Sequence, residues 1–151
     1  MKAVMFVCHG NICRSPTAEF VMKDILKRKG KDGLITVASS ATSAEELGNA
    51  VYPPARRVLE KHGINCEEKR AVRLKKDDYG KYDLFVCMDG HNVANALRIF
   101  GSDPDSKITL LTSATGKSGD IEDPWYSGNF DGVYNQIREC CEALAEKILK
   151  K

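Results

Sequence analysis

Residues 2–29 read KAVMFVCHGNICRSPTAEFVMKDILKRK and contain a strand-like run, a loop and a helix-like segment in that order. The run over residues 2–7 is short, apolar and rich in valine, which is typical of a buried β-strand. Residues 15–29 place apolar side chains three or four positions apart, which predicts an amphipathic helix. The chain therefore opens with a strand that leads through a tight loop into a helix.

The rest of the chain continues this alternation of short apolar runs and segments with helical spacing. Strands that are apolar on both faces and alternate with helices indicate a parallel sheet that is covered on both sides. We therefore expect an α/β fold, a single doubly wound domain over residues 1–151, with a four-stranded parallel sheet and helices on both faces. The further predicted strands are residues 34–39, 84–88 and 107–111, and the further predicted helices are residues 53–62, 91–100 and 130–149.

Composition and charge argue against several classes of protein. The 23 basic residues nearly balance the 21 acidic ones, so the formal charge of +2 gives no reason to expect a nucleic acid partner. No apolar run approaches the roughly 20 residues that span a bilayer, and we expect no membrane association. Six cysteines in a chain without an export signal favour reduced thiols and a cytoplasmic location. Because the three histidines are scattered and no CxxC pair occurs, we expect no metal site and no cofactor.

The loop after the first predicted strand has the composition of an anion-binding site. It reads CHGNICRSP over residues 8–16, a cysteine followed after five intervening residues by an arginine and a serine. Gly10 and Asn11 tolerate a positive φ, which lets successive backbone N–H groups turn inward. The start of the following helix adds its own unpaired N–H groups and the positive end of its dipole. We expect the loop, with His9, Ile12 and Cys13, to hold a phosphate group.

Three side chains of this loop have the chemistry of phosphate transfer. Arg14 can bind two phosphate oxygens with its planar fork and can stabilise charge in the transition state. A helix N-terminus and a guanidinium favour the ionised form of a thiol, so we expect Cys8 to be a thiolate and the nucleophile. Ser15 either donates its hydroxyl to the Cys8 sulfur or serves as a helix N-cap before Pro16. A purely structural Cys8 would leave Arg14 without a role.

A phosphate-transferring cysteine needs a proton donor for the leaving oxygen, and the late segment DIEDPWY offers carboxylic acids. Both Asp120 and Asp123 are candidates from their chemistry. Pro124 biases Asp123 toward an extended backbone conformation. The aromatic pair Trp125 and Tyr126 could line a slot for a flat phenol ring.

These segments together resemble the low-molecular-weight protein tyrosine phosphatases. The resemblance rests on the loop at residues 8–16, on SSATS at residues 39–43, on CMD at residues 87–89 and on DPWY at residues 123–126. It runs over essentially the whole chain in the same order. It implies a four-stranded parallel sheet and a metal-independent hydrolysis of phosphotyrosine. The partner is then a phosphotyrosine-containing protein, with a tyrosine kinase as one candidate.

The resemblance also implies a role for particular residues. Cys8 attacks the phosphate and forms a phosphocysteine, Arg14 holds the phosphate, and Asp123 protonates the tyrosine oxygen before it activates water. Asn11, Ser15 and Ser39 match positions that hold the phosphate loop in shape through hydrogen bonds. Cys13 matches a second loop cysteine that can form a reversible disulfide with the nucleophile.

Two positions depart from the family pattern. Glu45 stands where family members usually carry an aromatic residue that forms one wall of the substrate cleft. Lys69 stands where a histidine often joins the hydrogen-bond network of the loop. Neither change removes a reacting group, but the first alters the cleft that receives the substrate.

Other readings of the sequence remain open. Thioredoxin-coupled arsenate reductases share the fold and the first cysteine, but they use a cysteine pair after the third strand, whereas here no cysteine follows Cys87 before Cys140. Protein arginine phosphatases tend to carry threonine where this chain has Ile12.

A phosphate- or anion-binding module without catalysis is the alternative from another class. The TGKS sequence at residues 115–118 resembles the end of a Walker A loop, but Leu111 replaces the leading glycine.

Overall fold

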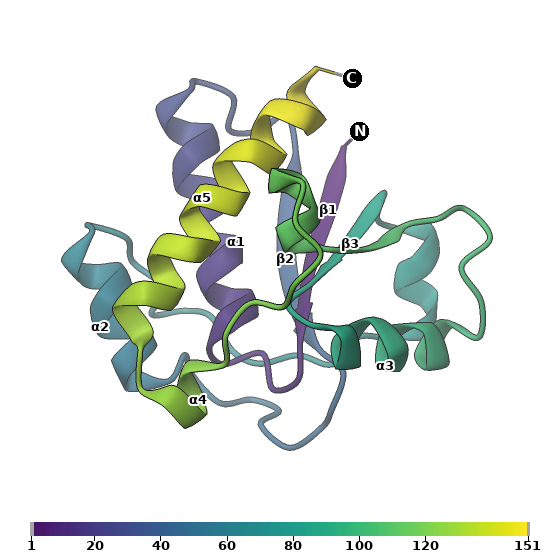
Figure 1. The fold of residues 1–151 in the computed structure, drawn as a ribbon, viewed down its shortest axis with the longest axis horizontal. Helices are drawn as coiled ribbons and strands as arrows, with labels where there is room; N and C mark the ends of the chain where they lie inside the picture. Colours follow the sequence, from purple (N-terminus) through teal and green to yellow (C-terminus); the bar gives the residue numbers. More distant parts are fainter. Residues whose placement is uncertain (1, 151) are drawn as a thin grey trace.

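The computed structural model describes residues 2–150, and its central feature is one parallel sheet (Figure 1). Within the described residues the sheet has four strands in the order β2-β1-β3-β4, and every neighbouring pair is parallel. This confirms the predicted four-stranded parallel sheet. The strands are β1 (Ala3–Cys8), β2 (Thr36–Ala41), β3 (Leu84–Cys87) and β4 (Ile108–Leu110).

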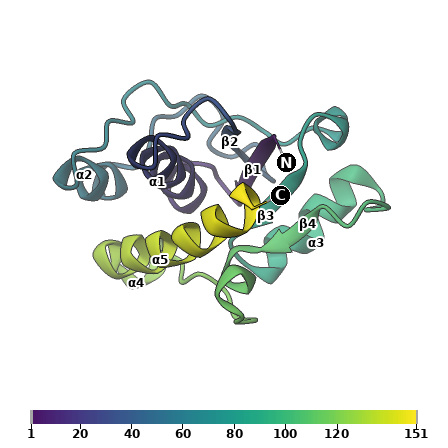
Figure 2. The same cartoon turned by 90° about the horizontal axis from the view of Figure 1, so that it is seen from above.

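Helices cover both faces of this sheet. The helices α1, α2 and α5 lie on one side of β1, and α3 lies on the other side (Figures 1 and 2). The 3₁₀ helix η1 shares the face of α3, because Tyr79 packs against the same core as Phe100. The helices are α1 (Arg14–Arg28), α2 (Pro53–Lys61), α3 (Gly90–Phe100), α4 (Pro124–Ser127) and α5 (Phe130–Leu149), with 3₁₀ helices η1 (Lys76–Gly80) and η2 (Leu111–Thr115).

The side chains of β1 alternate between two hydrophobic cores. Val4 and Phe6 belong to the larger core under α1, α2 and α5, whereas Met5 and Val7 belong to the core under α3. Successive side chains of a strand point to opposite faces, so a strand that is buried on both sides reads as a continuous apolar run. Each such side chain contributes on the order of 1.5–3 kcal/mol when it is fully buried.

The strand order reverses at β1, and this places the functional loops. The chain leaves β1 toward β2 on one side, then crosses back to add β3 and β4 on the other side. Loops at the carboxyl ends of β1 and β3 diverge at this point and leave a crevice, where open α/β sheets bind their ligands. Cys8 at the end of β1 and Asp89 just beyond β3 therefore face the same region.

The segment at residues 115–118 does not form a phosphate-binding loop before a helix. Gly116 has a φ of 77° and caps the C-terminal end of η2. In the described chain the next helix, α4, begins only at Pro124. A Walker A loop needs a helix directly after its lysine, so the match is accidental.

Candidate active site

The loop between β1 and α1 lines a cavity of about 330 Å³. Asn11 has a φ of 59°, in the left-handed region that asparagine tolerates, as predicted. Gly10 does not adopt a positive φ, so the prediction for this glycine was wrong. A Cβ atom at Gly10 would lie 3.4 Å from Cγ of Glu46. That distance is ordinary van der Waals contact with a side-chain atom, so packing against Glu46 does not require a glycine here.

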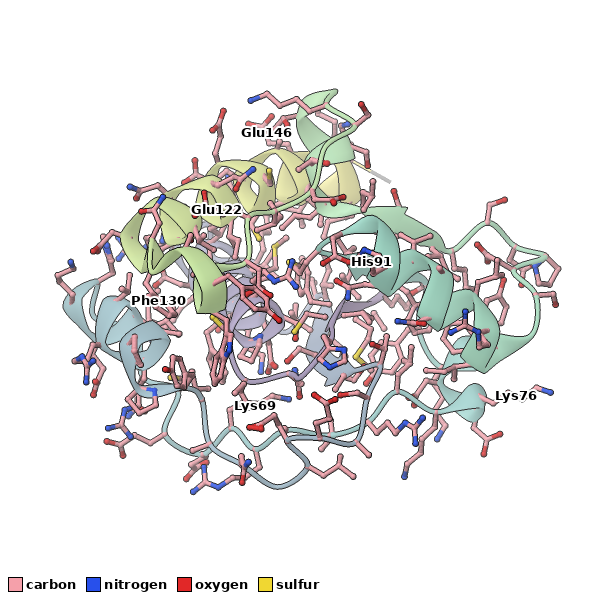
Figure 3. The ribbon with its side chains drawn as sticks, turned by 60° about the horizontal axis from the view of Figure 1, so that its bottom comes forward. Lys69, Lys76, His91, Glu122, Phe130 and Glu146 are labelled. Atoms are coloured by element: carbon pink, nitrogen blue, oxygen red, sulfur yellow. The ribbon has the colours of Figure 1, made fainter. Side chains whose placement is uncertain are left out.

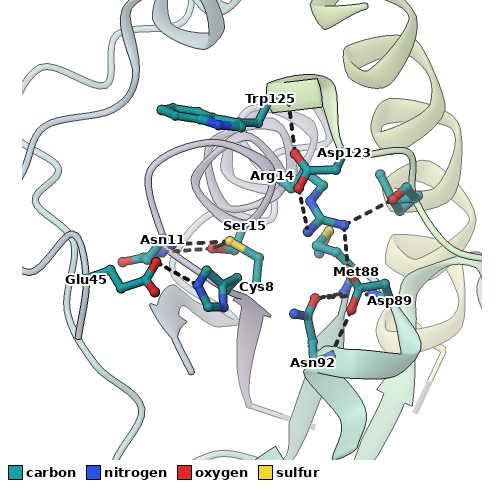
Figure 4. Close-up of polar contacts among 12 residues, drawn as sticks. Cys8, Asn11, Arg14, Ser15, Glu45, Met88, Asp89, Asn92, Asp123 and Trp125 are labelled. Carbon is teal, nitrogen blue, oxygen red and sulfur yellow. Dashed lines mark hydrogen bonds and ion pairs between the residues drawn. The ribbon is translucent and has the colours of Figure 1, made fainter. Parts of the chain in front are cut away.

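Cys8 is the last residue of β1 and is almost completely buried. Its Sγ lies 2.9 Å from Oγ of Ser15 and accepts a 3.3 Å hydrogen bond from the backbone N–H of Asn11 (Figure 4). The side-chain amide of Asn11 donates to Ser15 Oγ over 2.8 Å, so the hydroxyl keeps its own proton for the sulfur. Two hydrogen-bond donors therefore converge on the Cys8 sulfur.

Ser15 is not the N-cap of α1. The helix begins at Arg14, and the residue at the cap position is Cys13. Ser15 lies inside the first turn, is completely buried, and uses its hydroxyl for Cys8 and Asn11. Of the two predicted roles of Ser15, the contact with the cysteine is the one that the geometry supports.

Asn11 connects the loop to β2 and to the segment before η1. Its Nδ2 donates to Ser39 Oγ over 2.9 Å, and its Oδ1 accepts from the backbone N–H of Val72 over 3.0 Å. These bonds fix a residue whose backbone conformation is uncommon. Asn11, Ser15 and Ser39 lie together, in the arrangement that the resemblance implied.

A buried ion pair that involves Lys69 supports Ser39 from the other side. Ser39 Oγ donates to Glu19 Oε1 over 2.6 Å. Nζ of Lys69 donates to the backbone carbonyl of Ser39 over 3.0 Å and lies 3.6 Å from Glu19 Oε1. Burial lowers the pKa of Lys69, and the neighbouring Glu19 opposes this shift. Glu19 lies on α1 at a position that the helical spacing did not single out, and sequence reasoning missed it.

Arg14 is fixed by two partners and reaches toward a third. Its Nη1 donates to Asp89 Oδ2 over 2.9 Å and to the backbone carbonyl of Ile121 over 3.1 Å, and its Nη2 lies 3.6 Å from Asp123 Oδ2 (Figure 4). Burial opposes the charge, but the nearby Cys8, Asp89 and Asp123 outweigh it and raise the pKa of Arg14. The guanidinium is therefore held charged at the cavity.

Asp89 has two functions in this arrangement. It is the N-cap of α3, where its side chain accepts from the backbone N–H of Asn92 over 2.8 Å. Its second oxygen accepts from Arg14. The sequence placed Asp89 at a strand end without a role, because a contact between residues so far apart in the chain is visible only in the fold.

The structure separates the two candidate acids. Asp123 is the N-cap of α4, accepts from the backbone N–H of Trp125 over 3.0 Å, and lines the cavity beside Arg14. Asp120 does not line the cavity, and its Oδ1 accepts from the backbone N–H of Gly90 over 3.1 Å. Of the two candidate acids, Asp123 is therefore the one that shares the cavity with Cys8.

The walls of the cavity differ in chemistry. Trp125 and Tyr126 form an aromatic side and are 53% and 86% exposed. Glu45 and Glu46 form another side, as expected for Glu45 from the departure in the sequence. The volume is within the range of small-ligand sites. The residues that line the cavity are Cys8, His9, Gly10, Asn11, Ile12, Cys13, Arg14, Glu45, Glu46, Asp123, Trp125 and Tyr126.

Trp125 is held in place by a second aromatic residue. Its ring lies 4.6 Å, between centroids, from the ring of Tyr52, which also contacts Phe130 at 5.9 Å. The backbone N–H of Tyr52 donates to the carbonyl of Ile12 over 2.8 Å. Tyr52 thus joins the aromatic wall to the loop at residues 8–16, and no sequence pattern indicated this contact.

The second cysteine of the loop, Cys13, is a partly buried thiol. Burial raises the pKa of the Cys13 thiol, and the neighbouring Cys8 and Asp123 add to this shift. Cys13 is therefore a neutral thiol at physiological pH. Among residues 2–150 no disulfide is formed, and no group of three His, Cys, Asp or Glu side chains could hold a metal ion. No helix in that range is long and apolar enough to cross a membrane.

Fold and site together define a class of protein. A cysteine and an arginine share an anion-binding loop at the switch point of a parallel sheet, and a carboxyl group enters the same cavity from a distant loop. These are the groups that phosphate transfer requires. The class is that of small α/β phosphatases.

Comparisons with known proteins give the family. The family model described as low molecular weight phosphotyrosine protein phosphatase matches residues 3–151. The chain is 33% identical to the low molecular weight protein-tyrosine-phosphatase YfkJ of Bacillus subtilis, covering 100% of this chain and 98% of that protein. It is 38% identical to the low molecular weight phosphotyrosine protein phosphatase of Sus scrofa, covering 97% and 96%.

Solved structures agree with these matches. The crystal structure of Bacillus subtilis YfkJ superposes with a TM-score of 0.95 at 33% identity, covering 99% of this chain and 96% of that one. Vibrio vulnificus Wzb in complex with benzylphosphonate superposes with a TM-score of 0.84 at 28% identity, covering 97% and 98%. The chain therefore belongs to the low molecular weight protein tyrosine phosphatase family, and it is a protein tyrosine phosphatase.

Proposed function

We propose that this phosphatase hydrolyses phosphotyrosine in proteins through a phosphocysteine on Cys8, with Arg14 as the phosphate-binding group and Asp123 as the general acid and base. The observation that carries the proposal is the meeting of these three side chains in one cavity. Their order of action follows from their chemistry.

In the first step Cys8 Sγ attacks phosphorus, an S–P bond forms, and the bond between phosphorus and the tyrosine oxygen breaks. The leaving oxygen takes a proton from the carboxyl group of Asp123, so that tyrosine departs as a neutral phenol. Arg14 and the N–H groups of the loop stabilise the charge on the phosphate oxygens. The bonds from Arg14 to Asp89 and Ile121 support this role, because they fix the guanidinium before substrate binds.

In the second step a water molecule attacks phosphorus and gives a proton to the Asp123 carboxylate. The S–P bond breaks and inorganic phosphate leaves. The hydroxyl of Ser15, which lies 2.9 Å from the sulfur, can donate to Cys8 as negative charge returns to it. This bond makes the cysteine a better leaving group.

The aromatic wall supports phosphotyrosine as the substrate class. Trp125 offers a partly exposed ring at the mouth of the cavity, and an aromatic pair adds about 0.5–1.5 kcal/mol to simple burial. The benzylphosphonate in the Wzb complex likewise joins a phosphonate to a phenyl ring. The partner is then a phosphotyrosine-containing protein, a tyrosine kinase among the candidates. The free cysteines in residues 2–150 fit a reducing compartment, and we place the enzyme in the cytoplasm.

The test is phosphate release from phenyl phosphate and from a phosphotyrosine peptide in EDTA. We expect turnover by the natural chain and a loss of roughly 10⁴-fold or more in Cys8→Ser. Quenching with alkali during turnover, in which a phosphocysteine is stable, should leave phosphate on the peptide that contains Cys8. Cys140→Ser changes a buried cysteine on α5, outside the cavity lining, and is the matched control. Turnover that survives in Cys8→Ser, or that EDTA abolishes in the natural chain, would refute the mechanism.

A further inference from the structure

We propose that Glu45 and Glu46 form an acidic wall that selects phosphotyrosine flanked by lysine or arginine. The inference rests on the proposed function and adds a substrate preference to it. It starts from the place where this chain lacks the usual cleft aromatic and carries carboxylates at the cavity.

The acidic wall is anchored to the phosphate loop. Oε2 of Glu45 lies 2.8 Å from Nε2 of His9 (Figure 4). The hydroxyl of Ser43 donates to the backbone carbonyl of His9 over 2.9 Å, and the backbone N–H of Ser43 donates to the same oxygen over 3.1 Å. The segment that carries the two glutamates is therefore held at the edge of the loop, beside the cavity proposed to receive the phosphate.

The wall keeps negative charge even when His9 is protonated. The carboxylate of Glu46 accepts a 3.3 Å hydrogen bond from the amide of Asn49, which is neutral. Among the described residues, no cation lies within ion-pair distance of Glu46, whereas Glu45 has His9. Arg14, the other cation of the cavity lining, is buried and pairs with Asp89 and Asp123 rather than with either glutamate. The exposed rim is thus acidic although the chain as a whole is slightly basic.

The two walls are expected to contact different parts of the substrate. The aromatic wall, Trp125 backed by Tyr52, can receive the phenol ring. The residues next to the phosphotyrosine remain at the rim, where Glu45 is 70% exposed at its side chain. A basic neighbour is attracted there and an acidic neighbour is repelled, and each exposed pair changes binding modestly. Such a wall therefore affects the choice among peptides more than the chemistry at phosphorus.

The experiment compares three peptides that differ only in the two residues on each side of the phosphotyrosine, which are lysine, alanine or glutamate. We expect kcat/KM of the natural chain to be roughly tenfold higher for the lysine peptide than for the glutamate peptide at low salt. The ratio should shrink at about 0.5 M salt, because exposed charges are then screened. In the double variant Glu45→Gln with Glu46→Gln it should fall to about twofold or less.

The control is Glu146→Gln, an exposed glutamate near the end of α5 and far from Lys69 and the site (Figure 3). It should keep the tenfold ratio. Equal kcat/KM for the three peptides, with phenyl phosphate still hydrolysed, would refute the acidic wall and leave the proposed function intact. A double variant that retains the full ratio would refute it as well. If the natural chain released phosphate from none of these substrates, the proposed function would fail and the inference with it.

Discussion

Asp120 and Asp123 are neighbours in the sequence, but their carboxyl groups have different partners. Asp123 caps α4 and faces the cavity, whereas Asp120 binds the first residue of α3. We expect Asp123→Asn to lower kcat for phenyl phosphate by about 10²–10³-fold, because the leaving phenolate is no longer protonated. The asparagine side chain can still accept from Trp125, so α4 should keep its start. Steady-state kinetics with phenyl phosphate checks this.

The matched control is Asp120→Asn. We expect its kcat to stay within about twofold of the natural value, because the Asp120 side chain contacts neither the Cys8 sulfur nor the leaving oxygen. A 4-nitrophenyl ester has a better leaving group and needs less protonation. The loss in Asp123→Asn should therefore be smaller with 4-nitrophenyl phosphate than with phenyl phosphate. Equal losses with both esters would argue against Asp123 as the proton donor.

At the scale of single residues, the sequence predicted the groups whose chemistry is specific to their type. Cys8, Arg14 and Asp123 line one cavity, and their roles as nucleophile, phosphate-binding group and acid stay a proposal. The positive φ predicted at Gly10 was wrong, since composition shows where a backbone conformation is tolerated and not where it is used. Glu19 and Asp89 were missed as supporting residues because their partners lie in distant parts of the chain.

At the scale of elements, Lys69 joins α1 and β2 beneath the phosphate loop. It binds the Ser39 carbonyl and the Glu19 carboxylate, and Ser39 in turn binds Asn11. We expect Lys69→Met to lower the free energy of unfolding by roughly 1–3 kcal/mol, because a buried carbonyl and carboxylate lose a donor. We also expect kcat to fall several-fold with little change in KM, since Asn11 holds the loop that surrounds Cys8. Urea unfolding and steady-state kinetics measure the two effects.

Lys23→Met is the matched control, because Lys23 pairs with the same carboxylate. Its Nζ lies 2.6 Å from Glu19 Oε2, but its side chain is 47% exposed. Such a pair contributes about 0.5 kcal/mol or less. If Lys23→Met lowered stability and kcat as much as Lys69→Met, the buried contact with Ser39 would not be the cause.

Between these elements, the sequence did not predict three short helices, η1, η2 and α4, nor the contacts that join the larger elements. The four strands and the helices α1, α2, α3 and α5 lie where the periodicity of apolar residues placed them, with ends that shift by one or two positions. The sequence could not show that Tyr52 would pack on Trp125, or that Lys69 would donate to the backbone carbonyl of Ser39. Such contacts depend on the exact separation of α1, β2 and the loops between them.

At the scale of the whole molecule, the topology followed from a few physical rules. Strands buried on both faces need helices on both sides, and right-handed crossovers leave few arrangements for four parallel strands. The order β2-β1-β3-β4 then brings the loops after β1 and β3 together. This is why a loop motif, read from the sequence alone, could be assigned to the functional edge of the sheet.

The turn between α3 and β4 links distant parts of the molecule through Asp103. Its Oδ1 accepts from Tyr79 Oη over 2.6 Å and from the backbone N–H of Lys107 over 2.8 Å, and its Oδ2 accepts from the N–H of Ile108 over 3.0 Å. Tyr79 in turn packs against Phe100 in the smaller core. Burial alone would raise the pKa of Asp103, but these hydrogen bonds and the charge of Lys107 outweigh it and hold the pKa below its usual value.

A lowered pKa means that the folded chain binds fewer protons than the unfolded chain near that pH. The stabilisation by Asp103 is therefore present above its usual pKa near 3.8 and is lost as the pH falls through the lower, folded value. We expect Asp103→Asn to lower the free energy of unfolding by about 1–2 kcal/mol at pH 7, and the difference from the natural chain to shrink below about pH 4. Asp105→Asn, at an exposed neighbouring carboxyl, should change little at either pH. Urea unfolding of the three proteins from pH 7 to pH 3 tests this, and a difference that grew on acidification would contradict the assigned sign.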